Sequence, residues 1–165
     1  FVAKKAFERL NCPKIETNIS SSELIKYASN AFLATKISFI NEIANVCESV
    51  EANIDVVAEG MGLDSRIGPK FLKAGLGYGG SCFPKDVRAL QHISGENGYQ
   101  FQLLKSVIDV NNYQRWRFYH KIKGTLGNLN NKTIAIWGLS FKPETDDVRE
   151  SIALDLAQKF VDDGA

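Results

Sequence analysis

One long helical pattern constrains the fold of this chain more than any other feature. Ser20 precedes Glu23 by three residues, which is the spacing of a capping box at a helix start. From there to about residue 50 the apolar residues recur with a period near 3.6, at Leu24, Ala28, Phe32, Phe39, Ile43, Val46, Cys47 and Val50. A helix of about 27 residues is about 40 Å long. Because a small domain cannot cover such a helix, we expect it to form the spine of a two-fold dimer, with contacts from Phe32, Phe39, Ile40 and Ile43.

Other helical patterns surround the long one. We expect a short helix over residues 1–11, a second over 54–61 capped by Asn53, a third that begins near Pro84, and a fourth over 103–126. After a turn-rich stretch at 127–131, residues 133–137 form a β-branched run typical of a buried strand, and a helix follows over 151–161. This strand and helix lack the G-x-G-x-x-G fingerprint of a dinucleotide site. The sequence predicts a mostly α central domain, followed by the first strand and helix of an α/β Rossmann-like domain.

A glycine-rich loop leads into the helix near Pro84 and places a cysteine at the helix start. Residues 77–86 read Gly-Tyr-Gly-Gly-Ser-Cys-Phe-Pro-Lys-Asp, and proline suits the first helical turn. Cys82 would then lie beside unpaired backbone N–H groups at the positive end of a helix dipole, with Lys85 three residues further on. These conditions favour the reactive thiolate. A buried, inert cysteine in a flexible loop is the alternative.

The same segment resembles a known family. Residues 71–75 read Phe-Leu-Lys-Ala-Gly, and together with residues 77–90 they are similar to the active-site segment of the UDP-glucose 6-dehydrogenases. GDP-mannose dehydrogenases share parts of this segment and are the runner-up. Residues 138–151 resemble the start of the family's C-terminal nucleotide-sugar domain. The resemblance implies three regions: the end of an N-terminal cofactor domain with its connection (1–19), a helical central and dimerisation domain (20–129), and the start of a UDP-sugar-binding domain (130–165).

The resemblance also implies a reaction and its catalytic residues. In this family UDP-glucose is oxidised twice at C6 to UDP-glucuronate by NAD, and Cys82 would form a thiohemiacetal and then a thioester. Lys26 would stabilise oxyanion charge, Asn30 would donate a hydrogen bond to that oxygen or to water, and Asp86 would orient or deprotonate the water. From the residues alone, Lys26, Asn30 and Asn41 belong to a polar stripe that a solvated helix face would also explain.

Binding residues are implied by the same resemblance. The substrate-binding candidates are Arg66, Phe71, Lys73, Gly75, Tyr78, Gly79, Phe83 and Lys142, and the cofactor-binding candidates are Lys85 and Arg149. Arg66 matches an arginine that reaches the substrate of a neighbouring subunit, so its role requires a dimer. On spacing alone, Lys142 and Arg149 are equally well explained as surface charges.

Composition limits the class of protein. With 44% hydrophobic and 24% charged residues the chain is typical of a globular protein, and its net charge of +1 argues against nucleic acid or an anionic membrane as the main partner. The cysteines at 12, 47 and 82 lack metal-like spacing, so we expect no metal, and reduced thiols fit a cytoplasmic protein. No stretch is apolar enough for a membrane span. Both ends interrupt structural patterns, so we expect a fragment of a longer enzyme.

Two other functional classes stay open. A cysteine hydrolase needs an imidazole near the thiol, and the two histidines, His92 and His120, are expected to be structural. A noncatalytic dimerisation or sugar-nucleotide-binding module is the other, because the resemblance implies that the family's NAD-binding domain and its catalytic glutamate lie outside these residues.

Overall fold

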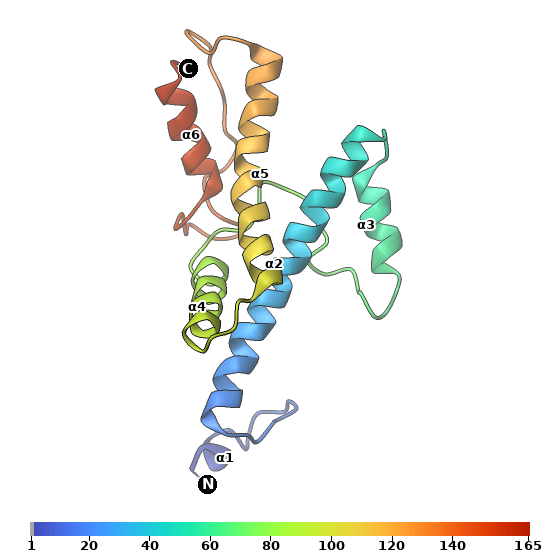
Figure 1. The fold of residues 1–165 in the computed structure, drawn as a ribbon, viewed down its shortest axis with the longest axis vertical. Coiled ribbons are helices and arrows are strands. Elements are labelled where there is room, and N and C mark those ends of the chain that lie inside the picture. Colours follow the sequence, from blue (N-terminus) through green and yellow to red (C-terminus); the bar gives the residue numbers. More distant parts are fainter. Residues whose placement is uncertain (1) are drawn as a thin grey trace.

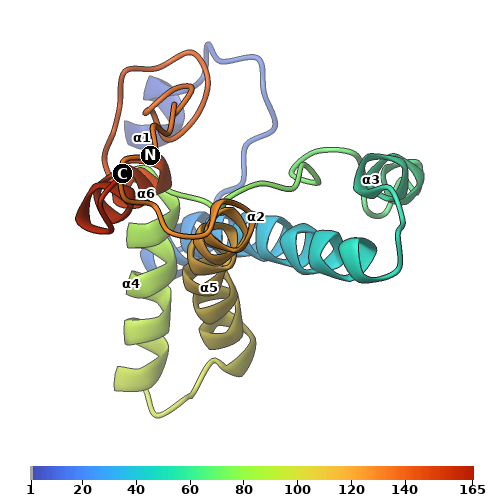
Figure 2. The same cartoon turned by 90° about the horizontal axis from the view of Figure 1, so that it is seen from above.

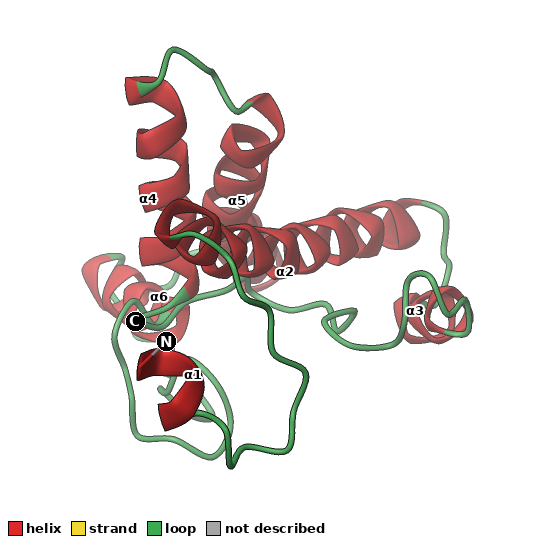
Figure 3. Ribbon diagram, turned by 90° about the horizontal axis from the view of Figure 1, so that it is seen from below, coloured by secondary structure: helices red, strands yellow, loops and turns green. Residues whose placement is uncertain are grey.

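The structure is a computed structural model that describes residues 2–165. Its helices are α1 (Val2–Ala6), α2 (Ile19–Ser49), α3 (Ile54–Gly62), α4 (Phe83–Glu96), α5 (Gln102–Leu126) and α6 (Ile152–Asp162). Helices and loops, with no strand, account for the described residues (Figure 3), so the prediction of a mostly helical central domain is confirmed. None of these helices combines the length and the apolar character needed to cross a membrane.

Helix α2 runs through the middle of the molecule (Figure 1), with α3 packed beside its C-terminal part. No glycine or proline interrupts its 31 residues, which span about 46 Å. The N-cap is Asn18, whose side-chain oxygen accepts a hydrogen bond from the Ser21 N–H at 2.8 Å. The capping box predicted at Ser20 is therefore wrong by two residues. The predicted cap of α3 is confirmed, because the Asn53 side chain accepts from the N–H groups of Asp55 and Val56.

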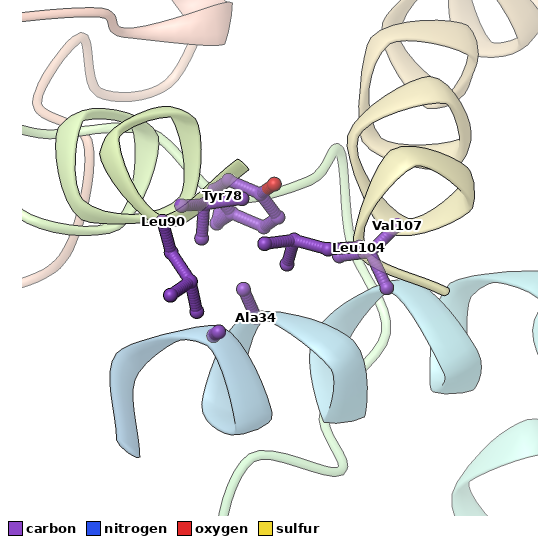
Figure 4. Packing of buried hydrophobic residues seen from close by; sticks show 7 residues of the cluster. Ala34, Tyr78, Leu90, Leu104 and Val107 are labelled. Atoms are coloured by element: carbon purple, nitrogen blue, oxygen red, sulfur yellow. The ribbon is translucent and has the colours of Figure 1, made fainter. Parts of the chain in front are cut away.

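The main core forms where α4 and α5, which lie side by side in Figure 2, pack across α2. Small residues on α2 permit this close approach, and Ala34 is fully buried. Figure 4 shows Ala34 facing Leu90 of α4, Leu104 and Val107 of α5, and the ring of Tyr78 from the glycine-rich loop. Burying each of the larger side chains contributes about 1.5–3 kcal/mol relative to leaving it in water. The core thus fixes the glycine-rich loop against three helices.

The outer face of α2 carries larger apolar side chains than its buried face. Phe32 is 66% exposed and Phe39 is 50% exposed, whereas the buried positions include Ser38 and Asn41. Ile40 is 0% exposed, so the prediction that it contributes to a dimer contact is wrong. Its side chain points into the chain's own core because it lies on the same side of α2 as the buried positions.

The C-terminal region packs against α5 through a second core. Tyr119 of α5 stacks on Phe160 of α6 at a centroid distance of 5.7 Å, with Leu129, Ile152 and Leu156 buried around them. Asp163 accepts hydrogen bonds from Lys123, Lys159 and the Tyr119 hydroxyl, and these donors hold the pKa of the Asp163 carboxyl well below its usual range.

The strand predicted over 133–137 does not form in the described part of the chain. These residues have no regular secondary structure, and no neighbouring strand supplies the ladder of hydrogen bonds that defines a sheet. The helix predicted to follow is present as α6. Helix α1 is shorter than the helix predicted over 1–11, and residue 1 of that prediction lies outside the described residues.

Candidate active site

Cys82 stands at the N-terminus of α4. It is the N-cap residue, its carbonyl accepts the Asp86 N–H at 2.9 Å, and Pro84 occupies the first turn as predicted. The thiol is exposed, with the Ser81 hydroxyl 3.8 Å from its sulfur. A buried structural cysteine is therefore excluded at this position. Cys82 therefore lies at the positive end of the dipole of a 14-residue helix.

One helical turn after the thiol, Asp86 gathers polar side chains from two helices. Its side chain is 5% exposed. One carboxylate oxygen accepts from Lys26 Nζ at 3.2 Å and from Asn30 Nδ2 at 2.5 Å, and the other lies 3.3 Å from Lys85 Nζ. Burial opposes ionisation of this carboxyl, but the three donors together outweigh burial and hold the pKa of Asp86 below its usual value. The structure thus joins the predicted residues of α2 to those of α4.

The loop before Cys82 is closed from the other side by the C-terminal region. The Gly80 N–H donates to the Arg149 carbonyl at 2.9 Å. A Cβ atom at Gly80, which has φ +80°, would lie 2.6 Å from the Phe141 ring, and one at Gly79 would lie 2.2 Å from the Glu150 carbonyl oxygen. Both positions therefore require glycine. The Arg88 guanidinium adds a two-pronged pair with the Glu150 carboxylate, at 2.9 and 3.0 Å.

Two cationic side chains predicted to bind substrate or cofactor, Lys142 and Arg149, belong to the C-terminal segment that closes the loop. The Arg149 guanidinium forms two hydrogen bonds with the Asp147 carboxylate, at 2.9 and 2.7 Å, and these bonds lower the pKa of Asp147 to about 2. The pKa of Arg149 is raised, mainly by its hydrogen bonds and charge interaction with Asp147. Lys142 Nζ lies 5.4 Å from the centre of the Phe141 ring, which covers Gly80.

Aromatic candidates gather beside the thiol. The Phe83 ring makes edge-to-face contacts with Phe71, at 6.1 Å between ring centres, and with Tyr78, at 6.0 Å. Tyr78 is buried, which raises the pKa of its hydroxyl to about 12. Lys73 and Gly75 are exposed on the same loop.

Arg66 does not join this group within one chain. Its side chain pairs with Asp64, 2.6 Å away, in the loop after α3. Lys36 Nζ holds that loop through the Ile67 carbonyl, and Lys36 lies about 15 Å further along α2 than Lys26, at ~1.5 Å per residue.

Sequence reasoning placed Asn41 only in a polar stripe on α2, and it missed Asn111 and Gln114 of α5 as residues that hold the glycine-rich loop. Asn111 of α5 hydrogen-bonds the backbone of Tyr78, and Gln114 Nε2 donates to the Gly75 carbonyl at 2.9 Å. The side-chain oxygen of Asn41 on α2 accepts the Gly75 N–H at 2.8 Å. A signal existed, because Asn111 continues the buried positions of Leu104 and Val107 at helical spacing, where an apolar residue is the rule.

The glycines of this loop do not make a dinucleotide fingerprint. Gly75, Gly77 and Gly80 have the spacing G-x-G-x-x-G, but no strand precedes them anywhere in residues 2–165. The fingerprint needs a strand before the glycines and a helix after them, and only the helix is present.

An exposed thiol at a helix N-terminus, beside a buried carboxylate fixed by a lysine and an asparagine, is an arrangement typical of enzymes that form covalent intermediates. Two family descriptions match the chain: "UDP-glucose/GDP-mannose dehydrogenase family, central domain" over residues 20–113, and the UDP binding domain of the same family over residues 135–165. The chain belongs to the UDP-glucose/GDP-mannose dehydrogenase family.

Named relatives agree with this assignment. The chain is 57% identical to the UDP-glucose 6-dehydrogenase YwqF of Bacillus subtilis over 95% of its own length and 36% of the relative's. It is 53% identical to TuaD, a second UDP-glucose 6-dehydrogenase of that organism, over 94% of this chain and 34% of that one. The chain thus spans about a third of the length of these curated relatives.

Solved structures have the same fold. A UDP-glucose dehydrogenase from Pyrobaculum islandicum superposes with a TM-score of 0.96 at 38% identity, over 99% of this chain and 38% of that one. A GDP-mannose dehydrogenase from Pseudomonas aeruginosa gives a TM-score of 0.54 at 30% identity, over 99% of this chain and 37% of that one.

Proposed function

We propose that this chain supplies the nucleophile and its supporting residues to an NAD-dependent dehydrogenase that oxidises UDP-glucose twice at C6, giving UDP-glucuronate. The observation that carries the proposal is the exposed Cys82 thiol at the start of α4, one turn from Asp86 with its bound Lys26 and Asn30. UDP-glucose is favoured over GDP-mannose because the backbone follows the UDP-glucose dehydrogenase far more closely. We place the boundary between the helical region and the UDP-sugar-binding region between residues 129 and 130.

The cations beside the thiol fit one part of NAD. Lys85 and Arg149 have exposed side chains close to Cys82, and guanidinium and ammonium groups suit the diphosphate of a dinucleotide. When bound, NAD accepts the hydride in each of the two oxidations. The substrate's own diphosphate and sugar would lie along residues 71–80, with Phe83 and Lys142 at the edge of the loop.

The side chains divide the remaining chemistry among them. After the first oxidation, the Cys82 sulfur adds to the aldehyde carbon, and the new oxyanion is stabilised by Lys26 and Asn30. Loss of the second hydride from that carbon leaves a thioester. Water then attacks the thioester and the carbon–sulfur bond breaks, which regenerates the Cys82 thiol and gives the carboxylic acid, whose proton passes to solvent. Asp86 orients this water, because its carboxylate is ionised and held in place.

The proposal is tested by product stoichiometry. The dehydrogenase that contains this chain is expected to form two NADH for each UDP-glucose consumed, and its kcat/KM for GDP-mannose is expected to be at least about 100-fold lower, since unmatched polar contacts are costly. Comparable kcat/KM values for GDP-mannose and UDP-glucose would favour a GDP-mannose dehydrogenase instead. If the full-length protein bound UDP-glucose tightly but formed no NADH, the alternative of a noncatalytic sugar-nucleotide-binding module would be favoured. The 165-residue chain by itself is expected to form no NADH.

We further propose that two copies of the chain pair through the outer face of α2. The exposed side chains of Phe32, Phe39 and Val46 follow one another along this helix. A two-fold contact would bury all three against the same face of α2 in the partner copy. Arg66 would then be available to the partner's site. The three free cysteines support a reducing, cytoplasmic setting for such a dimer.

The pairing is checked by sedimentation at micromolar concentration. The chain is expected to be a dimer, and Phe39→Glu is expected to weaken the dimer at least about 100-fold, because the substitution places a charge in an apolar contact. Asp109→Asn, at an exposed position on α5 and outside this face of α2, serves as the control and should leave the dimer intact. A folded monomer in the unmodified chain would rule the contact out.

A further inference from the structure

The Asn111 side chain pairs with both backbone polar groups of Tyr78. Its oxygen accepts the Tyr78 N–H at 2.7 Å, and its Nδ2 donates to the Tyr78 carbonyl at 3.1 Å. Asn111 is 4% exposed, so neither bond competes with bulk water. Because buried backbone groups must be paired, this amide replaces the partner strand or helical turn that the loop lacks.

The residues around this pair leave little freedom. Gly77 has φ +116°, and a Cβ atom there would lie 2.6 Å from the Asn111 oxygen. Gly75 is held from both sides, by Asn41 of α2 and by Gln114 of α5. Of the loop residues held by these amides, Tyr78, which Asn111 holds, is nearest in sequence to Cys82. Only Gly79, Gly80 and Ser81 separate the two.

We propose that Asn111 is a positioning residue for Cys82: by fixing the backbone at Tyr78 it keeps the sulfur at the N-terminus of α4. Two of the three intervening residues are glycines, and Gly80 has φ +80°, so the connection is flexible unless both of its ends are anchored. The Arg149 carbonyl anchors it at Gly80, and Asn111 anchors it at Tyr78. The inference rests on the proposed role of Cys82 as nucleophile.

The rate of alkylation of Cys82 tests this role without any turnover. In a Cys12→Ser background, with Cys47 buried, iodoacetamide reports on Cys82, and the modified site is verified by mass spectrometry. Asn111→Asp keeps the size and the acceptor for the Tyr78 N–H but loses the donor to the Tyr78 carbonyl. We expect alkylation to be about threefold slower, because the exposed sulfur gains no access and loses stabilisation from the helix N-terminus.

Two controls separate positioning from general stability. Val107→Ala removes packing from the core that surrounds Tyr78 but keeps both hydrogen bonds of Asn111, so it should lower the melting temperature and leave the alkylation rate unchanged. Asn112→Asp adds the same charge at an exposed neighbour and should change neither quantity. An alkylation rate in Asn111→Asp that equals or exceeds the parent rate overturns the proposal.

A second variant covers the case in which Asn111→Asp does not fold. Gly77→Ala retains Asn111 and presses a methyl group against its oxygen, so the same slowing is expected, and an unchanged rate again overturns the proposal. Failure of the proposed function has a different signature. It would appear as normal acid formation by Cys82→Ser, which the alkylation experiment neither needs nor affects.

Discussion

Under the proposed function, replacing Cys82 by serine is expected to slow formation of UDP-glucuronate by the full-length protein about 10³-fold or more. A serine hydroxyl stays protonated near pH 7 and is a much weaker nucleophile than a thiolate. The substitution changes little else, because the side chain is exposed, similar in size and makes no cap hydrogen bond to α4. The melting temperature should therefore stay within about 2 °C of the parent value. UDP-glucuronate measured by mass spectrometry gives the rate.

Cys12→Ser is the matched control for this substitution. Cys12 is also an exposed free cysteine, but it lies in the extended segment before α2, and the same exchange there should leave acid formation unchanged. If Cys82→Ser formed UDP-glucuronate at the parent rate, no carbon–sulfur intermediate would be needed, and the covalent route would be wrong.

Asp86→Asn is expected to have the next largest effect, lowering the rate of acid formation by about 10²–10⁴-fold. The new amide nitrogen would face donors on Asn30 or on the two lysines, so one polar contact becomes donor against donor. Leaving a buried polar group without a partner costs about 1–3 kcal/mol, and urea unfolding of the chain should show a loss in this range. Asp109→Asn, at an exposed position on α5, should change stability by less than about 0.5 kcal/mol.

The stability gap between the parent chain and Asp86→Asn should depend on pH in a defined direction. The folded-state pKa of Asp86 lies below its ordinary value, so the ionised carboxylate stabilises the fold above the unfolded value of about 3.9. As pH falls through the folded-state pKa, that contribution is lost. We therefore expect a constant gap between pH 5 and 8 and a smaller gap below about pH 4. A gap that persists unchanged to pH 3 would assign the stabilisation to hydrogen-bond geometry rather than to charge.

Local signals in the sequence predicted the elements that local physics determines. Asn53 precedes a short apolar helix and caps it, and Pro84 follows Cys82 in the first turn of α4 as its restricted backbone favours. The N-terminus of α2 was misplaced because Asn18 and Ser20 are both good caps. Only the extended backbone at Asn18, with ψ 167°, decides between them, and the sequence does not encode that choice locally.

The spacing of residues within one helix or strand could not predict contacts between parts of the chain that are far apart in sequence. Lys26 and Asp86 lie 60 residues apart, and nothing in either helical pattern shows that their buried sides meet. The strand predicted at 133–137 fails for a related reason. β-branched residues favour extended backbone, but a strand exists only when another strand pairs with it.

The closure of the glycine-rich loop by the turn at 147–151 sets an order of events during protein synthesis. A ribosome adds roughly 5–20 residues per second from the N-terminus, so Cys82 leaves it several seconds before Arg149 and Glu150 are made. Until then Gly80 lacks its carbonyl acceptor, and Arg88 lacks its carboxylate. A nascent chain therefore carries the Cys82 thiol before the contacts that close its loop can form. Premature termination upstream of this turn would yield a polypeptide in which Gly80 and Arg88 never gain these partners.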